Sequence, residues 1–121
     1  MYIQVLSLLF GIAFVFVGIA GFMPTFTMDG YLFGLFMVNM LHNLVHIMSG
    51  VIGILAAFKF IYAKWYFRIL GIVYILVMIL GFIRSEILHT IGLHMNLADN
   101  FLHLLIALVA LYLGWAVRIR N

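Results

Sequence analysis

The sequence contains no cysteine, a single proline and very few charged residues. Without cysteine the chain can form neither a disulfide framework, a thiolate metal site nor a redox thiol. Because Pro24 is the only proline, the helices that the apolar stretches predict can run unbroken. Charged residues make up 7% and hydrophobic residues 69% of the 121 residues, and a soluble domain of this composition would leave its apolar surface uncovered. Lipid is therefore the predicted solvent and the main predicted partner.

The six Lys and Arg residues give a net charge of +3 but form no basic face, so we expect no nucleic-acid partner. Their positions instead predict the orientation in the membrane. Three cations lie between residues 59 and 68, and two more, Arg118 and Arg120, lie near the end of the chain. The positive-inside rule places both groups, and with them both termini, on the cytoplasmic side.

Apolar windows predict four transmembrane helices in a single domain, residues 1–121. They cover residues 2–22, 31–58, 69–83 and the stretch from Ala98 to Val117. The first lacks a basic start and a small-x-small cleavage site, so we interpret it as a retained helix rather than a signal peptide. We expect a sharp turn at Asp29-Gly30, interfacial or re-entrant chain at 31–38, and a short cytoplasmic loop at 59–68. The predicted fold is an all-α membrane bundle.

Two polar boxes interrupt the apolar sequence. The first polar box is Asn39–His46 and the second is Asn96–His103, 57 positions later, and both fit the pattern N-x-x-(H/D)-N-x-x-H. Each box opens an even-numbered helix, which predicts two parallel helical-hairpin repeats of about residues 1–60 and 61–121. Counting back from the cytoplasmic cations places both boxes in the outer half of the membrane, facing each other.

The boxes predict a metal site. His42 and His46 are four residues apart and so share a helix face, and Asp99 and His103 have the same spacing. Three imidazoles and one carboxylate suit a divalent metal, zinc first, with iron or copper as alternatives. The copper alternative would use nearby thioethers. These belong to Met37, Met40 and Met95.

Further polar residues lie around these candidates. Four box asparagines can orient the ligands from behind: Asn39, Asn43, Asn96 and Asn100. Glu86 and His89 form an E-x-x-H turn at the outer end of the third helix, and we include them as weaker metal candidates, because di-iron bundles need two such motifs.

Two other interpretations of the boxes stay open. The polar residues can form hydrogen bonds that hold the helices together in a purely structural or interaction protein. Alternatively, His46 and His103 can be the axial ligands of a haem in an electron carrier, a less favoured interpretation because Asp99 and the asparagines suit a porphyrin face poorly. The sequence has no nucleophile elbow and identifies no substrate, so the expectation leans away from an enzyme. Transport through one copy is not expected, although a homo-oligomer would change that.

The first polar box, with Gly34-Leu35-Phe36 before it and Gly50 and Gly53 behind it, resembles an uncharacterised domain-of-unknown-function family of small bacterial membrane proteins. That family has four predicted helices and a second box like Asp99-Asn100-x-x-His103. The resemblance covers nearly the whole chain and implies a four-helix architecture in a bacterial-type inner membrane. It implies no activity.

Overall fold

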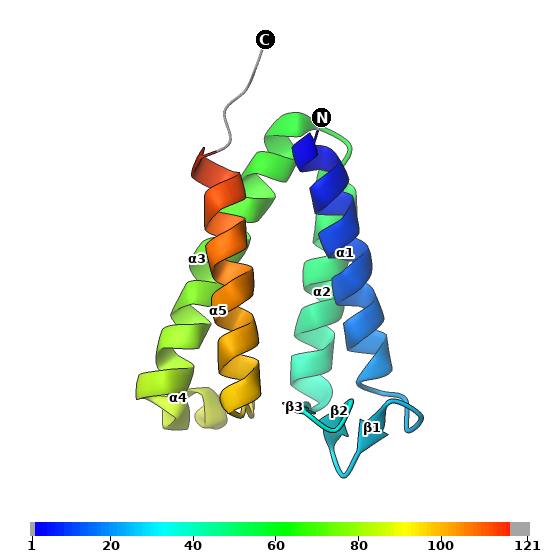
Figure 1. Ribbon diagram of the computed structural model, residues 1–121, viewed down its shortest axis with the longest axis vertical. Helices are drawn as coiled ribbons and strands as arrows, with labels where there is room; N and C mark the ends of the chain where they lie inside the picture. The colour runs from blue at the N-terminus through cyan, green and yellow to red at the C-terminus, as the bar shows by residue number, and fades with distance from the viewer. Residues whose placement is uncertain (1, 117–121) are drawn as a thin grey trace.

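The computed structural model describes residues 2–116, and Arg118 and Arg120 lie outside this range. Four long helices make up most of it: α1 (Tyr2–Ala20), α2 (Met40–Ala56), α3 (Phe60–Ile83) and α5 (Leu97–Leu111), which continues as the π-helical turn η1 (Tyr112–Ala116). A short helix, α4 (Ser85–Thr90), connects α3 to α5. In Figure 1, α1 pairs with α2 and α3 pairs with α5, and the two hairpins meet near the N-terminus and draw apart toward the other end.

Three of the helical segments are long and apolar enough to cross a membrane: Tyr2–Ala20, Phe60–Ile83 and Leu97–Ala116. Helix α2 is apolar but shorter, at 17 residues. Large hydrophobic side chains cover the outside of the bundle, as expected for surfaces that contact lipid. The structure thus confirms a predominantly helical protein with membrane-like helices.

The apolar core lies between the hairpins at the end where they meet. Ile3 and Phe67 are almost fully buried there, and Ala107 and Ala110 let α5 approach its neighbours closely. The side chain of Ser7 reaches across this region and donates a 2.7 Å hydrogen bond to a carbonyl of α2. The core therefore fixes one end of the bundle, and the polar boxes lie toward the other end.

A small antiparallel sheet covers the end of the bundle near the boxes. The all-α prediction did not include this sheet. Its strands are β1 (Thr27–Met28), β2 (Tyr31–Leu32) and β3 (Phe36–Met37), in that order. Asp29 and Gly30 both have positive φ and join β1 to β2, so the predicted turn at this dipeptide is confirmed. The interfacial stretch 31–38 folds as strands because positive-φ residues divide it into pieces too short for a helix.

The segment 59–68, predicted to be a loop, is helical from Phe60 onward. It contains no proline or glycine, and nothing in it breaks the helical hydrogen bonding of α3. Arg68 lies over the rings of Trp65 and Trp115, at 4.9 and 5.5 Å from their centroids. The mixture of cations and aromatics that suggested a loop therefore belongs to the first turns of a longer helix.

A candidate metal centre between helices α2 and α5

Each polar box begins with an asparagine that caps its helix. The Asn39 side chain accepts a hydrogen bond of 2.9 Å from the backbone N–H of His42, and the Asn96 side chain accepts one of 3.0 Å from the backbone N–H of Asp99. Asn96 and Asp99 also form a full capping box. These caps start both helices at the same place in the pattern, so the residues four positions apart point into the bundle.

The two capping asparagines also tie the two hairpins together. Nδ2 of Asn39 donates to the carbonyl of Gly92 at 2.6 Å, and Nδ2 of Asn96 donates to the carbonyl of Leu35 at 2.8 Å. Each box therefore holds the loop that precedes the other box. These reciprocal bonds bring α2 and α5 to the same level at the box end.

Three histidines come together between these helices. One ring nitrogen each of His42, His46 and His103 lies within 4.8 Å of the others, and the three residues are only 2–4% exposed. The ring centroids are 4.4 Å apart for His42 and His46, 5.7 Å for His42 and His103, and 6.3 Å for His46 and His103. We call these residues the histidine triad. Their donor atoms can hold a metal ion.

The polar atoms of this region do not satisfy one another. Five buried side-chain atoms within residues 2–116 have no hydrogen-bond partner: His42 Nε2, Asn43 Oδ1, His46 Nδ1, Asn100 Oδ1 and His103 Nδ1. Every ring of the histidine triad thus contributes one such nitrogen. Leaving a buried polar atom unpaired costs roughly 1–3 kcal/mol, so a purely structural network would be expected to pair them.

His42 is oriented by the backbone of the small sheet, at Met37 in β3. Its Nδ1–H donates to the carbonyl of Met37 at 3.0 Å, because a carbonyl can only accept. This bond fixes the tautomer that leaves a lone pair on Nε2. A histidine ligand typically has its other ring nitrogen engaged in this way.

Asp99 lies apart from the histidine triad and binds backbone instead. Its Oδ2 accepts hydrogen bonds from the N–H of Met37 at 3.1 Å and of Asn96 at 2.9 Å. Asp99 and His46 nevertheless line the same small cavity, of about 50 Å³. The carboxylate is therefore close to the predicted metal site, but in this structure it stabilises the start of α5 and the edge of the sheet.

Asn43 and Asn100 pack in equivalent ways, Asn43 against the end of α1 and Asn100 against α3. A side chain at Gly21 would overlap Asn43, and one at Gly81 would overlap Asn100, whose Nδ2 donates to the carbonyl of Gly81 at 3.2 Å. Their side chains therefore fill spaces that glycines leave open, and they pack the boxes against α1 and α3.

Glu86 and His89 are not brought to the histidine triad. Glu86 is exposed on α4 and pairs with Arg84, whose hydrogen bond lowers the pKa of the Glu86 carboxyl. His89 instead packs against His94 in the outer loop, with the ring centroids 4.4 Å apart. In the part of the chain that the structure describes, the one group of potential ligands is the histidine triad.

Sequence reasoning missed the aromatic residues beside the triad. Phe14 packs against His46 with centroids 5.8 Å apart, and Tyr74 packs against His103 at 5.2 Å. The hydroxyls of Tyr74 and Ser49 are 3.3 Å apart. A repeat in the odd-numbered helices could have indicated these residues, since Phe14 and Tyr74 are 60 positions apart in the sequence, as are Gly21 and Gly81.

The comparison with protein families identifies a family for this chain. Residues 4–116 match the family described as "Domain of unknown function (DUF4383)". The chain belongs to this family. The match covers nearly all of the described residues, which confirms the predicted membership of an uncharacterised domain family. No curated protein and no solved structure matches the chain.

Proposed function

We propose that this DUF4383 protein is a small multi-pass membrane protein that binds a divalent metal ion, most favourably zinc, through the histidine triad. One observation carries the proposal. Three buried histidine rings each offer a nitrogen within 4.8 Å of the other two, and each ring has a nitrogen without a hydrogen-bond partner. Zinc binds imidazole nitrogen at about 2.0–2.1 Å in tetrahedral geometry, so its ligand atoms lie roughly 3.3 Å apart. Metal binding therefore requires the three ring nitrogens, now within 4.8 Å of one another, to move closer together.

Three histidines leave a fourth coordination position on a tetrahedral ion. Asp99 shares a cavity with His46, and its hydrogen bonds within the described residues use Oδ2 alone. We therefore propose that Asp99 completes the site from the opposite wall of this cavity. Asn43 and Asn100 then pack behind the ligands, and Asn39 and Asn96 set the helix starts. Glu86 and His89 have no part in this site.

The two rival interpretations account less well for the same atoms. A structural hydrogen-bond network predicts paired polar groups, but each triad ring has an unpaired buried nitrogen. A haem held by His46 and His103 needs open space between them, and the His42 ring lies 4.4 Å from one and 5.7 Å from the other. A metal ion alone fits this crowding.

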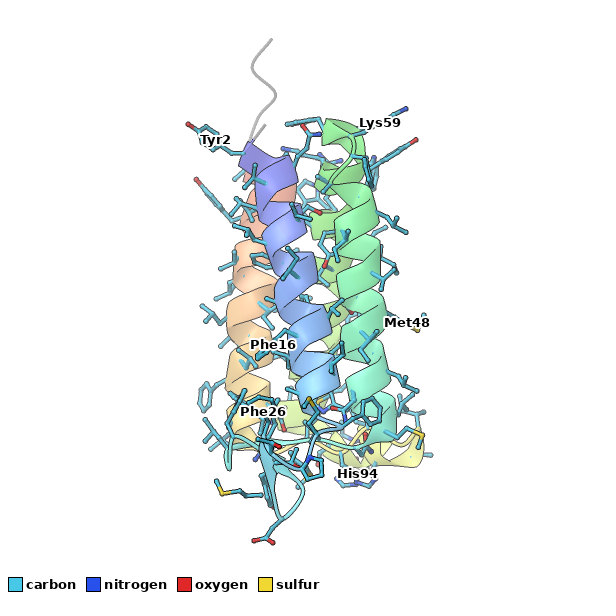
Figure 2. The ribbon with its side chains drawn as sticks, turned by 90° about the vertical axis from the view of Figure 1, so that its right-hand side faces the viewer. Tyr2, Phe16, Phe26, Met48, Lys59 and His94 are labelled. Carbon is cyan, nitrogen blue, oxygen red and sulfur yellow. The ribbon has the colours of Figure 1, made fainter. Side chains whose placement is uncertain are left out.

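We further propose four membrane spans and two parallel repeats, with both termini in the cytoplasm of a bacterial-type cell. Helix α2 has 17 residues, the lower limit for a span. The reciprocal Asn39 and Asn96 bonds and the paired contacts of Gly21 and Gly81 support the repeat. Figure 2 shows Lys59 and Tyr2 at one end and Phe26 and His94 at the other, and the cationic end is the expected inside.

Metal content tests the proposal directly. The protein is purified in detergent without chelators, and bound metals are measured by mass spectrometry beside a visible spectrum. We expect about one zinc per chain, lost in His42→Ala, His46→Ala or His103→Ala and kept in the matched control His89→Ala. A folded, metal-free and colourless wild-type protein, which also fails to bind added zinc, would reject the metal site. A Soret band would favour haem instead.

The orientation is tested separately, and the absence of native cysteine makes this simple. Single cysteines replace Met28 in the outer turn and Phe58 beside Lys59, which are both exposed. In intact cells, a membrane-impermeant thiol reagent should label the first variant and not the second. The reverse pattern would show that the boxes face the cytoplasm.

A further inference from the structure

A large apolar groove lies between α1 and α5, which belong to different hairpins. Its volume is about 450 Å³, within the usual range of small-molecule pockets of roughly 300–1,000 Å³. Leu6, Phe10 and Ala13 line it from α1, and Leu102 and Ile106 line it from α5. His46 is the one residue with a polar side chain in its wall.

The groove is elongated along the helices. Its lining on α1 extends from Leu6 to Val17, which corresponds to roughly 16 Å at the helical rise. Both lining helices are long and apolar enough to span a membrane, so the groove runs along the bilayer normal at hydrocarbon depth. This is the direction and the environment of a lipid hydrocarbon chain.

The groove becomes polar at one end only. Val17, His46 and Leu102 also line the small cavity of about 50 Å³, whose wall includes Asp99 and side chains of the small sheet. The two spaces therefore adjoin at these three residues. The polar end lies at the outer side, where the head group of an outer-leaflet amphiphile would be.

We propose that the groove binds the hydrocarbon chain of a single-chain amphiphile, with an uncharged hydroxyl head at the end of the groove that adjoins the small cavity. A hydroxyl costs far less to bury than an ionised fatty-acid carboxylate, whose charge would lie unpaired against apolar walls. The cavity is too small for a phosphate-bearing head group. This site goes beyond the proposed metal function, because the chain is held by apolar walls that need no metal.

Electron paramagnetic resonance tests this in vesicles of phosphatidylcholine. The probe is octadecanol with a nitroxide near its methyl end, and immobilised probe is counted per protein. We expect wild type to immobilise about one probe beyond the general lipid shell. Ala13→Trp, which fills the groove, should abolish this component. The matched control Ile12→Trp places the same ring on the lipid-facing neighbour and should keep it.

The outcomes separate this site from the metal site. A chelator should leave the immobilised component unchanged, and Ala13→Trp should keep its zinc content, so failure of either proposal leaves the other intact. Equal spectra for Ala13→Trp and Ile12→Trp would overturn the groove as a binding site. Nitroxide-labelled stearic acid immobilised as strongly as the alcohol would overturn the hydroxyl head.

Discussion

In the α1–α2 hairpin, Gly11 faces the backbone of its partner helix, whereas in the α3–α5 hairpin Gly71 faces the side chain of Leu111. A Cβ at Gly11 would lie 2.6 Å from the Gly50 carbonyl oxygen. One at Gly71 would lie 2.7 Å from Cδ2 of Leu111 and 3.0 Å from the Leu111 backbone nitrogen. A leucine can change rotamer, but a helix backbone can only move as a whole. Gly11 and Gly71, which occupy corresponding positions in the two hairpins, therefore differ in how well they can accept a larger side chain.

This difference predicts the largest effect of substitution. Gly11→Ala should lower the free energy of unfolding by about 3 kcal/mol, because α1 and α2 must separate. Gly71→Ala should cost about 1–2 kcal/mol, because the Leu111 side chain can move aside and its backbone nitrogen, 3.0 Å away, needs only a small shift. Unfolding by SDS titration in mixed micelles measures both. Equal losses of stability in the two variants would mean that the two hairpins pack alike. Gly30→Ala is not a suitable control, because a φ of +84° at Gly30 would strain any other residue.

His42 and Asp99 occupy the same position in the two boxes and bind the same residue, Met37. His42 donates to its carbonyl at 3.0 Å, and Asp99 accepts from its N–H at 3.1 Å. One box thus supplies a donor and the other an acceptor to a single strand residue. The two boxes therefore differ here in the group that they supply, and the small sheet is held by both hairpins.

The second prediction removes one side of this arrangement. Asp99→Ala leaves the N–H groups of Met37 and Asn96 without their acceptor, and we expect a loss of about 2 kcal/mol. Asp99→Asn retains an oxygen and should recover about half of it. The same SDS titration, performed on metal-free protein, separates this effect from metal binding. An Asp99→Ala protein as stable as wild type would show that these bonds hold nothing in place.

The location of the site could be predicted because polar residues are costly in an apolar chain. The spacing of four between His42 and His46 determines a shared helix face, and the offset of 57 identifies His103 as a partner. The structure places these three side chains together. The helical class followed from composition for the same reason, because few other architectures tolerate so little charge.

Other features depended on contacts that a sequence pattern does not contain. The role of Asp99 depends on Met37, which reaches it only because the small sheet folds back over the boxes. Lysine and arginine among aromatics are equally typical of a loop and of a helix end, so the start of α3 at Phe60 was missed. Tyr74 has no polar neighbour in the sequence, and its contact with His103 requires the packing of α3 on α5.

A third prediction compares the two aromatics beside the triad. Tyr74 has a hydroxyl 3.3 Å from that of Ser49, and Phe14 has none. Tyr74→Phe makes the second hairpin resemble the first and should cost about 0.6–1 kcal/mol, typical of one hydrogen bond between membrane helices. Ser49→Ala should cost the same, and the double variant no more than either. Additive losses would show that the two hydroxyls do not interact.

The smallest effect is expected at the ion pair of Arg84 and Glu86, which has no counterpart in the described residues of the first hairpin. Glu86 pairs with Arg84, and the two side chains are 61% and 60% exposed, so water and salt screen the attraction. The pairing lowers the Glu86 pKa, so its contribution is present above the ordinary pKa of a glutamate and is lost as the pH falls through the lowered value. Glu86→Gln should therefore leave the melting temperature at neutral pH and physiological salt unchanged within error. Only at low ionic strength should the melting temperature of the wild type slightly exceed that of the variant, and acidification should remove that difference.

The zinc content of the Glu86→Gln variant should equal that of the wild type. A loss of zinc would return the E-x-x-H turn to the metal site and would mean that α4 moves toward the histidine triad.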